Sequence, residues 1–178
     1  MNTPQSGGAG PASGGGDLAS STIIARGMAI QAAKADVAMG RISVKGNITS
    51  SQFLAGYSTA GADVNPDAQI GTVTVGGNWT ASDLVAGVAK GGNVGFGDPL
   101  NIKASGPDNA AIISGIASIS IVGTATAAGE NVTHAFTAQQ IVKMKVGAIV
   151  LPFDAIPANQ SIEVGGPAAN LLAREIAL

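Results

Sequence analysis

The chain has 178 residues, of which 11% are charged, 3% are aromatic and 26 are glycines; its net charge is −2 and it has no cysteine. Without a basic excess, nucleic-acid binding is not expected, and without cysteine there are no disulfides, thiolate zinc sites or thiol catalysis. No stretch of about 18 apolar residues predicts a membrane-spanning helix. With so few large side chains, the core must be built from small residues, which stacked strands achieve better than a loose helical bundle.

The first 17 residues are mostly Gly, Ser, Pro and Ala, and we expect them to form a flexible leader ahead of a single domain over 18–178. They contain neither a basic region nor an apolar run, so they do not form a signal peptide. The segment 28–40, MAIQAAKADVAMG, fits a short amphipathic helix with Gly40 just past its end, and it fits another strand equally well.

A short pattern recurs from residue 22 onward, in which two apolar residues flank a polar one and a glycine soon follows. Alternation with a period of two is typical of a strand with one buried face. The last apolar residue of each such triplet recurs about every 23 residues, a spacing that indicates a repeat architecture. These residues are Ile24, Val44, Val75, Ala104, Ile121, Val146 and Val164.

The segment 40–56, GRISVKGNITSSQFLAG, is nearly repeated by 71–87, GTVTVGGNWTASDLVAG. The two segments predict equivalent strands on neighbouring units, with Val44 beside Val75 and Phe53 beside Leu84. The sequence therefore predicts an all-β fold, a parallel β-solenoid of about six or seven coils with a possible short N-terminal helix. A β-sandwich built from hairpins is the alternative.

Two loops rich in Gly, Asn, Asp and Pro, at 57–69 and 90–101, interrupt the repeats and are expected to project from the fold. Loops on a repeat scaffold often carry recognition. Tyr57 and Phe96 are the candidate ligand-binding residues, because their rings could stack on a sugar. The single tryptophan, Trp79, aligns with Ile48 and is interpreted as a core residue.

No catalytic constellation emerges, and we predict no enzyme activity and no cofactor. The single histidine, His134, is not accompanied by the Gly-x-Ser-x-Gly elbow of many hydrolases. The acidic residues are scattered, and Asp83 aligns with Gln52, so the repeats do not place a row of carboxylates in one groove.

The residues Asp63, Asn65 and Asp67 alternate like the first ligands of a calcium-binding EF-hand loop. Pro66 lies among them, and Ala68 occupies the position that needs glycine. No closing glutamate follows, so a plain turn is favoured over a metal site.

The runs GRISVKGNITSSQFLAGY, AQIGTVTVGGNWTASDLVAGV, IASISIVG, HAFTAQQIVKMKVG and SIEVGG resemble the repeat-rich, strand-dominated exported proteins of environmental bacteria, planctomycete-type proteins among them. The resemblance covers roughly 22–176 and implies no catalytic motif. Loops of that family often carry acidic runs suggestive of calcium, whereas the loop 89–101 keeps only Asp98.

We therefore expect a non-catalytic structural or adhesive β-solenoid module of a large exported bacterial protein, located outside the cell or on its surface. Possible partners are a second copy, stacked end to end through unpaired strand edges, and a glycan or another cell-surface molecule. The alternatives are a glycan-binding module and, less favoured, a carbohydrate-active enzyme. No nucleic-acid partner and no membrane span are expected.

Overall fold

The structure is a computed structural model that describes residues 12–28, 34–91, 95–127, 134–154, 156–165 and 171–177. Its regular elements are all strands, and the described residues contain no helix. The strands are β1 (Ala12–Gly14), β2 (Leu18–Ala19), β3 (Thr22–Ala25), β4 (Val37–Val44), β5 (Ile48–Thr49), β6 (Gln52–Ala55), β7 (Gln69–Val75), β8 (Trp79–Thr80), β9 (Asp83–Ala86), β10 (Val88–Ala89), β11 (Ile102–Lys103), β12 (Gly115–Ile121), β13 (Ala125–Thr126), β14 (His134–Ala138), β15 (Gln140–Ile141), β16 (Met144–Val146), β17 (Ile149–Leu151), β18 (Ser161–Glu163) and β19 (Leu171–Glu175).

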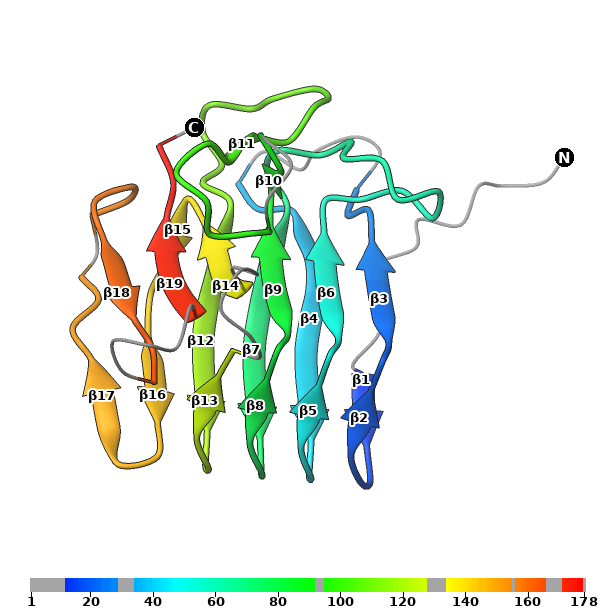
Figure 1. Ribbon diagram of the computed structural model, residues 1–178. Helices are drawn as coiled ribbons and strands as arrows, with labels where there is room; N and C mark the ends of the chain where they lie inside the picture. The colour runs from blue at the N-terminus through cyan, green and yellow to red at the C-terminus, as the bar shows by residue number, and fades with distance from the viewer. Residues whose placement is uncertain are drawn as a thin grey trace, which may run out of the picture.

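These strands form three larger sheets and one pair (Figure 1). Sheet A has the order β1-β4-β7-β12-β16-β17, and β15 also pairs with β12. Sheet B has the order β13-β8-β5-β2, and sheet C the order β18-β19-β14-β9-β6-β3. The remaining pair is β10 with β11, which is antiparallel.

The main hydrophobic core lies between sheet A on one side and sheets B and C on the other. Sheet A contributes fully buried aliphatic residues such as Ile42 and Val73. Facing them is an aromatic stack in which the ring of Trp79 lies 5.8 Å from that of Phe53 and 4.8 Å from that of Phe136, between ring centroids. One stack of aromatic side chains thus anchors a core that is otherwise made of aliphatic and other small apolar residues and methionines.

The register predicted from the repeated segments is confirmed. Val44 pairs with Val75 in sheet A, and Phe53 pairs with Leu84 in sheet C. Trp79 pairs with Ile48 and is fully buried, as its place in the repeat predicted. The sequence match therefore corresponds to adjacent parallel strands.

Rows of side-chain hydrogen bonds hold this register at the turns between the sheets. The backbone N–H of Ser51 donates to Oγ of Ser82 at 2.9 Å, and that of Ser21 donates to Oγ of Ser51 at 3.2 Å. Just before these serines, Ser20, Ser50 and Ala81 each adopt a φ of 47°. A left-handed residue other than glycine costs about 1–2 kcal/mol, so the repeated hydrogen bonds offset a repeated backbone strain.

The fold-class prediction of a parallel β-solenoid of six or seven coils is wrong. Sheets A and C are mixed, because β17 pairs antiparallel with β16 and β18 pairs antiparallel with β19. Three of the seven triplets predicted to stack do not join the others in sheet A. Ile24 pairs with Leu54 in sheet C, Ile102 belongs to the antiparallel pair β10–β11, and Val164 follows β18.

The reason for this error is physical, because period-two alternation reports that one face of a strand is buried. It does not report which sheet the strand joins or whether its neighbour runs parallel. The layering resembles that of a sandwich, but the neighbouring strands in sheet B, and most of those in sheets A and C, are parallel rather than joined by hairpins.

Two predictions for the N-terminal part, the short helix at 28–40 and the flexible leader at 1–17, can be compared with the structure only where residues are described. The short-helix reading of 28–40 is wrong for Val37–Gly40, which belong to β4, whereas 29–33 lie outside the described residues. Of the predicted leader, 1–11 also lie outside the described residues. Ala12–Gly14 form β1 and pair in parallel with β4, an arrangement that a flexible leader would not have.

Candidate functional site

A groove crosses the outer face of sheet C, on the side opposite the main core. It consists of two adjoining hollows of about 420 and 370 Å³ that share Thr22 and Gln52 in their lining. The remaining lining includes Tyr57, Asp63, Lys90 and Phe96 in the first hollow and Ser50, Asp83 and His134 in the second. We call this feature the sheet C groove.

The floor of the groove is a row of polar side chains set by strand register. Thr22 pairs with Gln52 and Gln52 pairs with Asp83, so the three residues occupy equivalent positions on β3, β6 and β9. Neighbouring strands are about 4.8 Å apart, which places a hydrogen-bonding group at each step across the sheet. A row of this kind suits a ligand with repeated polar groups.

Asp83 organises one end of this row and is only 3% exposed. Its Oδ2 accepts a hydrogen bond from Nε2 of Gln52 at 2.9 Å. Its Oδ1 accepts one from the backbone N–H of Ala135 at 3.1 Å and lies 3.3 Å from Nδ1 of His134. Because both carboxylate oxygens are engaged, Asp83 fixes the orientation of the Gln52 amide and of the His134 ring.

With Nε2 of Gln52 turned to Asp83, Oε1 of the same amide is left as an acceptor. If Nδ1 of His134 donates to Asp83, Nε2 of the ring is an acceptor as well. The row therefore offers the hydroxyl of Thr22 and the amide oxygen of Gln52, with the imidazole of His134 beside Asp83 at its end.

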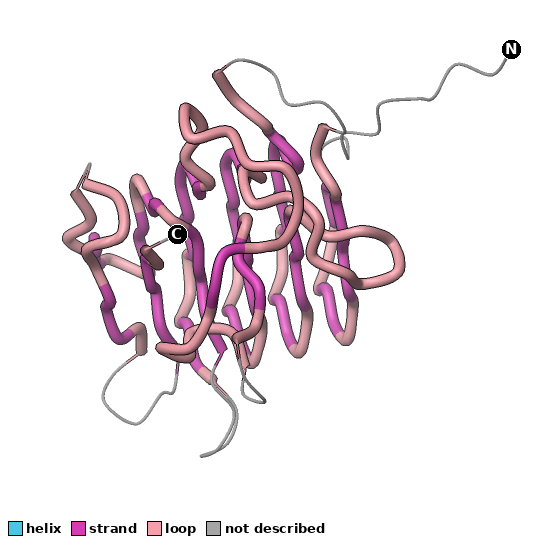
Figure 2. Tube along the Cα trace, turned by 90° about the horizontal axis from the view of Figure 1, so that it is seen from above, coloured by secondary structure: helices cyan, strands magenta, loops and turns pink. Residues whose placement is uncertain are grey.

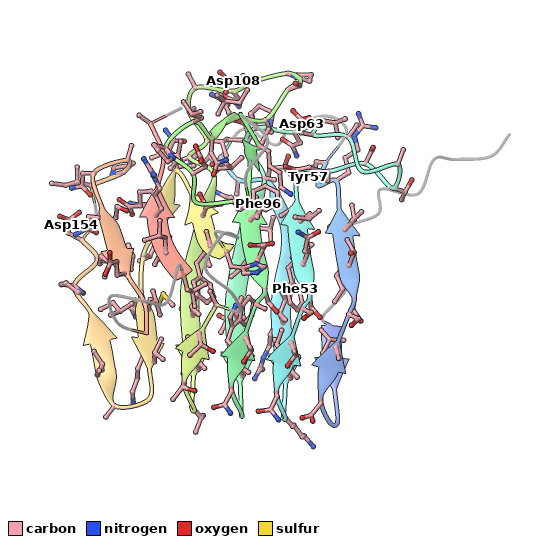
Figure 3. The ribbon with its side chains drawn as sticks, in the orientation of Figure 1. Phe53, Tyr57, Asp63, Phe96, Asp108 and Asp154 are labelled. Carbon is pink, nitrogen blue, oxygen red and sulfur yellow. The ribbon has the colours of Figure 1, made fainter. Side chains whose placement is uncertain are left out.

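The predicted ligand-binding residues Tyr57 and Phe96 come together at the other end of the groove (Figure 3). Their rings meet edge to face, with centroids 6.4 Å apart, and they are only 6% and 2% exposed. Oη of Tyr57 donates to the carbonyl oxygen of Val88 at 2.8 Å, and burial, followed by the charge of Asp63, raises the pKa of the phenol. Nζ of Lys90 lies 4.7 Å from the centroid of the Phe96 ring. These rings form a wall with their edges and do not present open faces for stacking.

The three calcium candidates are separated by their hydrogen bonds. Oδ2 of Asp63 accepts from the backbone N–H of Ser105 at 2.7 Å, and this bond is the main reason that the pKa of Asp63 is lowered. Nδ2 of Asn65 donates to the carbonyl oxygen of Arg26 and to Oδ2 of Asp36. Within the described ranges, no three His, Cys, Asp or Glu side chains are grouped as a metal ion would require.

The third candidate, Asp67, joins two loops. Its Oδ2 accepts from the backbone N–H of Asn109 at 2.8 Å, while its buried Oδ1 has no hydrogen-bond partner. Burial is the main cause of its raised pKa. Together with the bond from Ser105 to Asp63, this contact fastens the 57–68 connection to the 101–112 connection, beyond one end of the strands (Figures 1 and 2).

The central residues of the groove were not predicted as site residues. The alignment of Asp83 with Gln52 was read as the absence of a carboxylate row, although an amide beside a carboxylate is a hydrogen-bonding pair. That alignment was the available signal for Gln52. Nothing in the sequence indicates the contact of His134 with Asp83, because 51 residues of irregular spacing separate them.

No family model, characterised protein or solved structure matches this chain. The resemblance to exported proteins of environmental bacteria, and the extracellular location that it implies, therefore remain predictions. No helix in the described part of the chain is long and apolar enough to cross a membrane.

Proposed function

We propose that this protein is a non-catalytic adhesive module that binds a neutral glycan in the sheet C groove, as part of a bacterial surface or exported protein. The observation that carries the proposal is the row of Thr22, Gln52 and Asp83 on adjacent strands, with the amide of Gln52 locked by Asp83. A binding group that is already oriented loses less conformational freedom when the ligand docks.

The composition of the groove favours a sugar over other polar ligands. Hydroxyl and amide groups line the groove at Thr22 and Gln52, and Ile24 and Leu54, two positions further along the same strands, add apolar surface. A pyranose ring presents hydroxyls at its rim and C–H groups on its faces, so both the polar and the apolar lining would be used. Small-molecule sites commonly combine apolar lining with a few placed polar groups in this way.

A binding role is favoured over hydrolysis by the state of the carboxylates. Glycoside hydrolysis generally needs two carboxyl groups that face the scissile bond, one as an acid and one as a base or nucleophile. Asp83 has both oxygens occupied by protein groups, and Asp63 is bound to the amide of Ser105. The two carboxylates also line different hollows, so they do not form the facing pair that hydrolysis needs.

The test is binding to soluble neutral polysaccharides, such as xylan, mannan and mixed-linkage glucan, by affinity electrophoresis and calorimetry. Gln52→Leu removes the oriented amide at similar volume, and we expect it to weaken binding about tenfold, the equivalent of about 1.4 kcal/mol. Thr74→Ala, on the outer face of sheet A, is the control and should bind like the wild type. Binding that Gln52→Leu leaves unchanged, or no binding to any of these polymers, would contradict the proposal.

Self-association is the second candidate function, and one observation favours it. The edge strand β17 exposes Ile149 and Val150 by 67% and 71%, and its three residues carry no charge. Exposed edge strands without charged residues are prone to pair with another chain. Light scattering should show concentration-dependent assembly that Val150→Lys abolishes, whereas a wild type that stays monomeric up to millimolar concentration would exclude this role.

A further inference from the structure

The outer face of sheet A is a surface that the proposed glycan groove does not use. Its strands present rows of hydroxyl side chains in register. One row consists of Ser43, Thr74 and Ser120 and ends at Lys145; a second begins at Arg41 and continues through Thr72 and Ser118. Because sheets A and C face each other across the core, this surface points away from the sheet C groove.

The charge on this face has a single sign. Arg41 and Lys145 lie on its strands, Lys45 directly follows β4, and Lys143 directly precedes β16; all four are exposed. The strands β4, β7, β12, β16 and β17 contain no Asp or Glu, although the chain as a whole is acidic. None of the four cations forms an ion pair within the part of the chain that the structure describes, where the ion pairs are Lys103–Asp108 and His134–Asp83.

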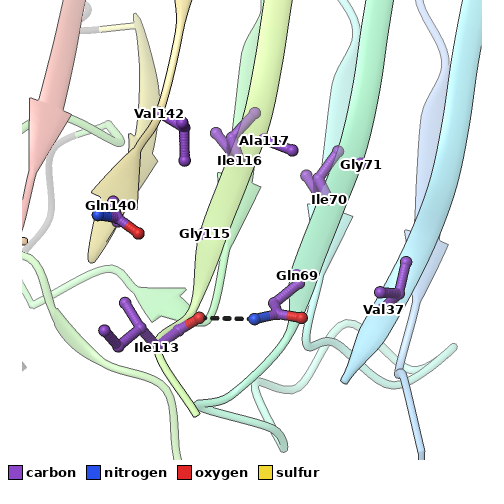
Figure 4. A pocket seen from close by; sticks show the side chains of 10 residues that line it. All are labelled: Val37, Gln69, Ile70, Gly71, Ile113, Gly115, Ile116, Ala117, Gln140 and Val142. Carbon is purple, nitrogen blue, oxygen red and sulfur yellow. Dashed lines mark hydrogen bonds between the residues drawn. The ribbon is translucent and has the colours of Figure 1, made fainter. Parts of the chain in front are cut away.

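Two hollows indent this face and meet at Val142, which lines both. The first, of about 190 Å³, lies over the entry of β4, β7 and β12, where Gly71, Gly115 and Ala117 leave the surface low (Figure 4). Nε2 of Gln69 donates to the carbonyl oxygen of Ile113 at its border. The second, of about 360 Å³, is lined by Ser118, Ser120, Lys143 and Lys145 together with the apolar Val150 and Phe153.

We propose that the outer face of sheet A is a docking surface for an acidic polysaccharide, with a carboxylate held in the second hollow between Lys143 and Lys145. The in-register hydroxyl rows bind the sugar hydroxyls, and Arg41 meets a further carboxylate at the opposite margin of the sheet. Four cations that form no ion pair within the described residues produce a positive potential that attracts an anionic chain and falls with added salt.

The spacing of the charges favours an acidic polysaccharide over a phosphate polymer. Duplex nucleic acid requires a dense basic patch, because it carries one negative charge per 1.7 Å or so of its axis. Here hydroxyl-bearing strands separate Arg41 from Lys145. A chain of sugars with carboxylates at intervals and hydroxyls between them matches this alternation.

The experiment uses the full chain with polygalacturonate as the probe, in affinity electrophoresis and calorimetry at low and at physiological salt. The double variant Lys143→Gln/Lys145→Gln should weaken binding about tenfold or more, and Thr74→Val should weaken it by a smaller factor through its lost hydroxyl. Arg26→Gln/Lys34→Gln changes the net charge equally at exposed residues outside sheet A, and it should bind within about twofold of the wild type. Thermal melting should confirm that the exposed substitutions leave the fold intact.

Three outcomes would overturn this inference. The first is that polygalacturonate does not bind, and the second is that the Arg26→Gln/Lys34→Gln control loses as much affinity as the sheet A variant. The third is that polyphosphate of matched charge binds as tightly, which would indicate attraction to any polyanion. The inference is independent of the sheet C groove, because Gln52→Leu should leave polygalacturonate binding unchanged and Lys143→Gln/Lys145→Gln should leave neutral glycan binding unchanged.

Discussion

The part of the chain before residue 91 and the part after residue 95 build the same sheets by different means. In the first part, the hydrogen-bonded turn residues are 30 or 31 positions apart from one unit to the next. In the second part, the step from Asn78 to Thr124 takes 46 positions, and that from Ser114 to Gln139 takes 25. A regular spacing lets each unit repeat the hydrogen bonds of the unit before it.

Where the spacing becomes irregular, individual side-chain hydrogen bonds replace the repeated rows of hydrogen bonds. The carboxylate of Glu175 is one example, because it accepts from the backbone N–H of Ile141 at 2.8 Å and from that of Asn159 at 3.3 Å. The same part of the chain contains the antiparallel strands β17 and β18. The comparison indicates that repetition specifies parallel register, whereas local carboxylate contacts close the irregular end.

The strongest test of this comparison is Trp79→Ala, because the ring of Trp79 joins the two parts by packing between Phe53 and Phe136. The side chain is fully buried, and its Nε1 donates to the carbonyl oxygen of Ser82 at 3.0 Å. Truncating a buried tryptophan costs about 3–5 kcal/mol. Urea unfolding followed by circular dichroism should show this loss in the free energy of unfolding.

Phe153→Ala is the matched change in the irregular part, where the ring is only partly buried against the core. It should cost less than half as much, since the area removed from water is smaller. Equal losses for the two variants would mean that the aromatic stack does not connect the two parts.

The next largest effect should come from Ser82→Ala, which removes a member of the repeated serine row. Oγ of Ser82 accepts from the buried backbone N–H of Ser51, so the substitution leaves that donor without a partner at a cost of about 1–3 kcal/mol. Ser21→Ala, at the start of the row, loses only an exposed bond to the carbonyl oxygen of Ala19 and should change stability by less than about 0.5 kcal/mol. If chemical denaturation gives the same loss in the free energy of unfolding for both variants, the serine row does not hold the register of the strands.

Sequence reasoning predicted the regular part of the fold well and the irregular part poorly. The match of 40–56 to 71–87 was sufficient to place Val44 beside Val75, because both segments repeat the buried residues and the turn residues together. The triplet at Ile162–Val164 had only its three-residue alternation, which an antiparallel strand satisfies equally well. The longer match carried information on register, and the short one did not.

The candidate site was predictable to a similar degree. Tyr57 and Phe96 were expected in the loops and do line one hollow, but their burial could not be foreseen because it depends on contacts with Val88 and neighbouring strands. Gln52 could be aligned with Asp83 from the repeat. The position of His134 could not be predicted, because its contact with Asp83 depends on how the irregularly spaced strands of the second part pack against the first.

A smaller effect is expected for the asparagine row at the outer turns. Oδ1 of Asn47 accepts from the backbone N–H of Asn78 at 2.8 Å, and Oδ1 of Asn78 accepts from that of Thr124 at 2.9 Å. Both bonds are exposed, so Asn47→Ala and Asn78→Ala should each lower the free energy of unfolding by about 0.5–1.5 kcal/mol. If only the register of the strands determines the contribution of each bond, thermal melts should show equal losses of stability for the two variants. This should hold even though the bond from Thr124 to Asn78 spans a longer insertion. A loss confined to Asn47→Ala would mean that the regular part holds its turn more tightly than the irregular part.

The last expected effect is a change in pH dependence, and it tests the irregular end through Glu175. Burial is the main cause that raises the pKa of this carboxyl above its ordinary value of 4.5, and the charge of Asp154 acts in the same direction. As the pH rises above 4.5, the unfolded chain releases this proton before the folded protein does, so the folded state loses relative stability across that window. Glu175→Gln removes the titration and keeps an oxygen for the N–H of Ile141, so stability should fall less steeply between pH 4.5 and 7. Some slope should remain, because the pKa of Asp67 is raised as well.

The control is Glu163→Gln, which removes an exposed carboxylate from β18. If Glu163→Gln flattens the dependence of stability on pH as much as Glu175→Gln does, the buried carboxylate contacts of Glu175 do not determine that dependence.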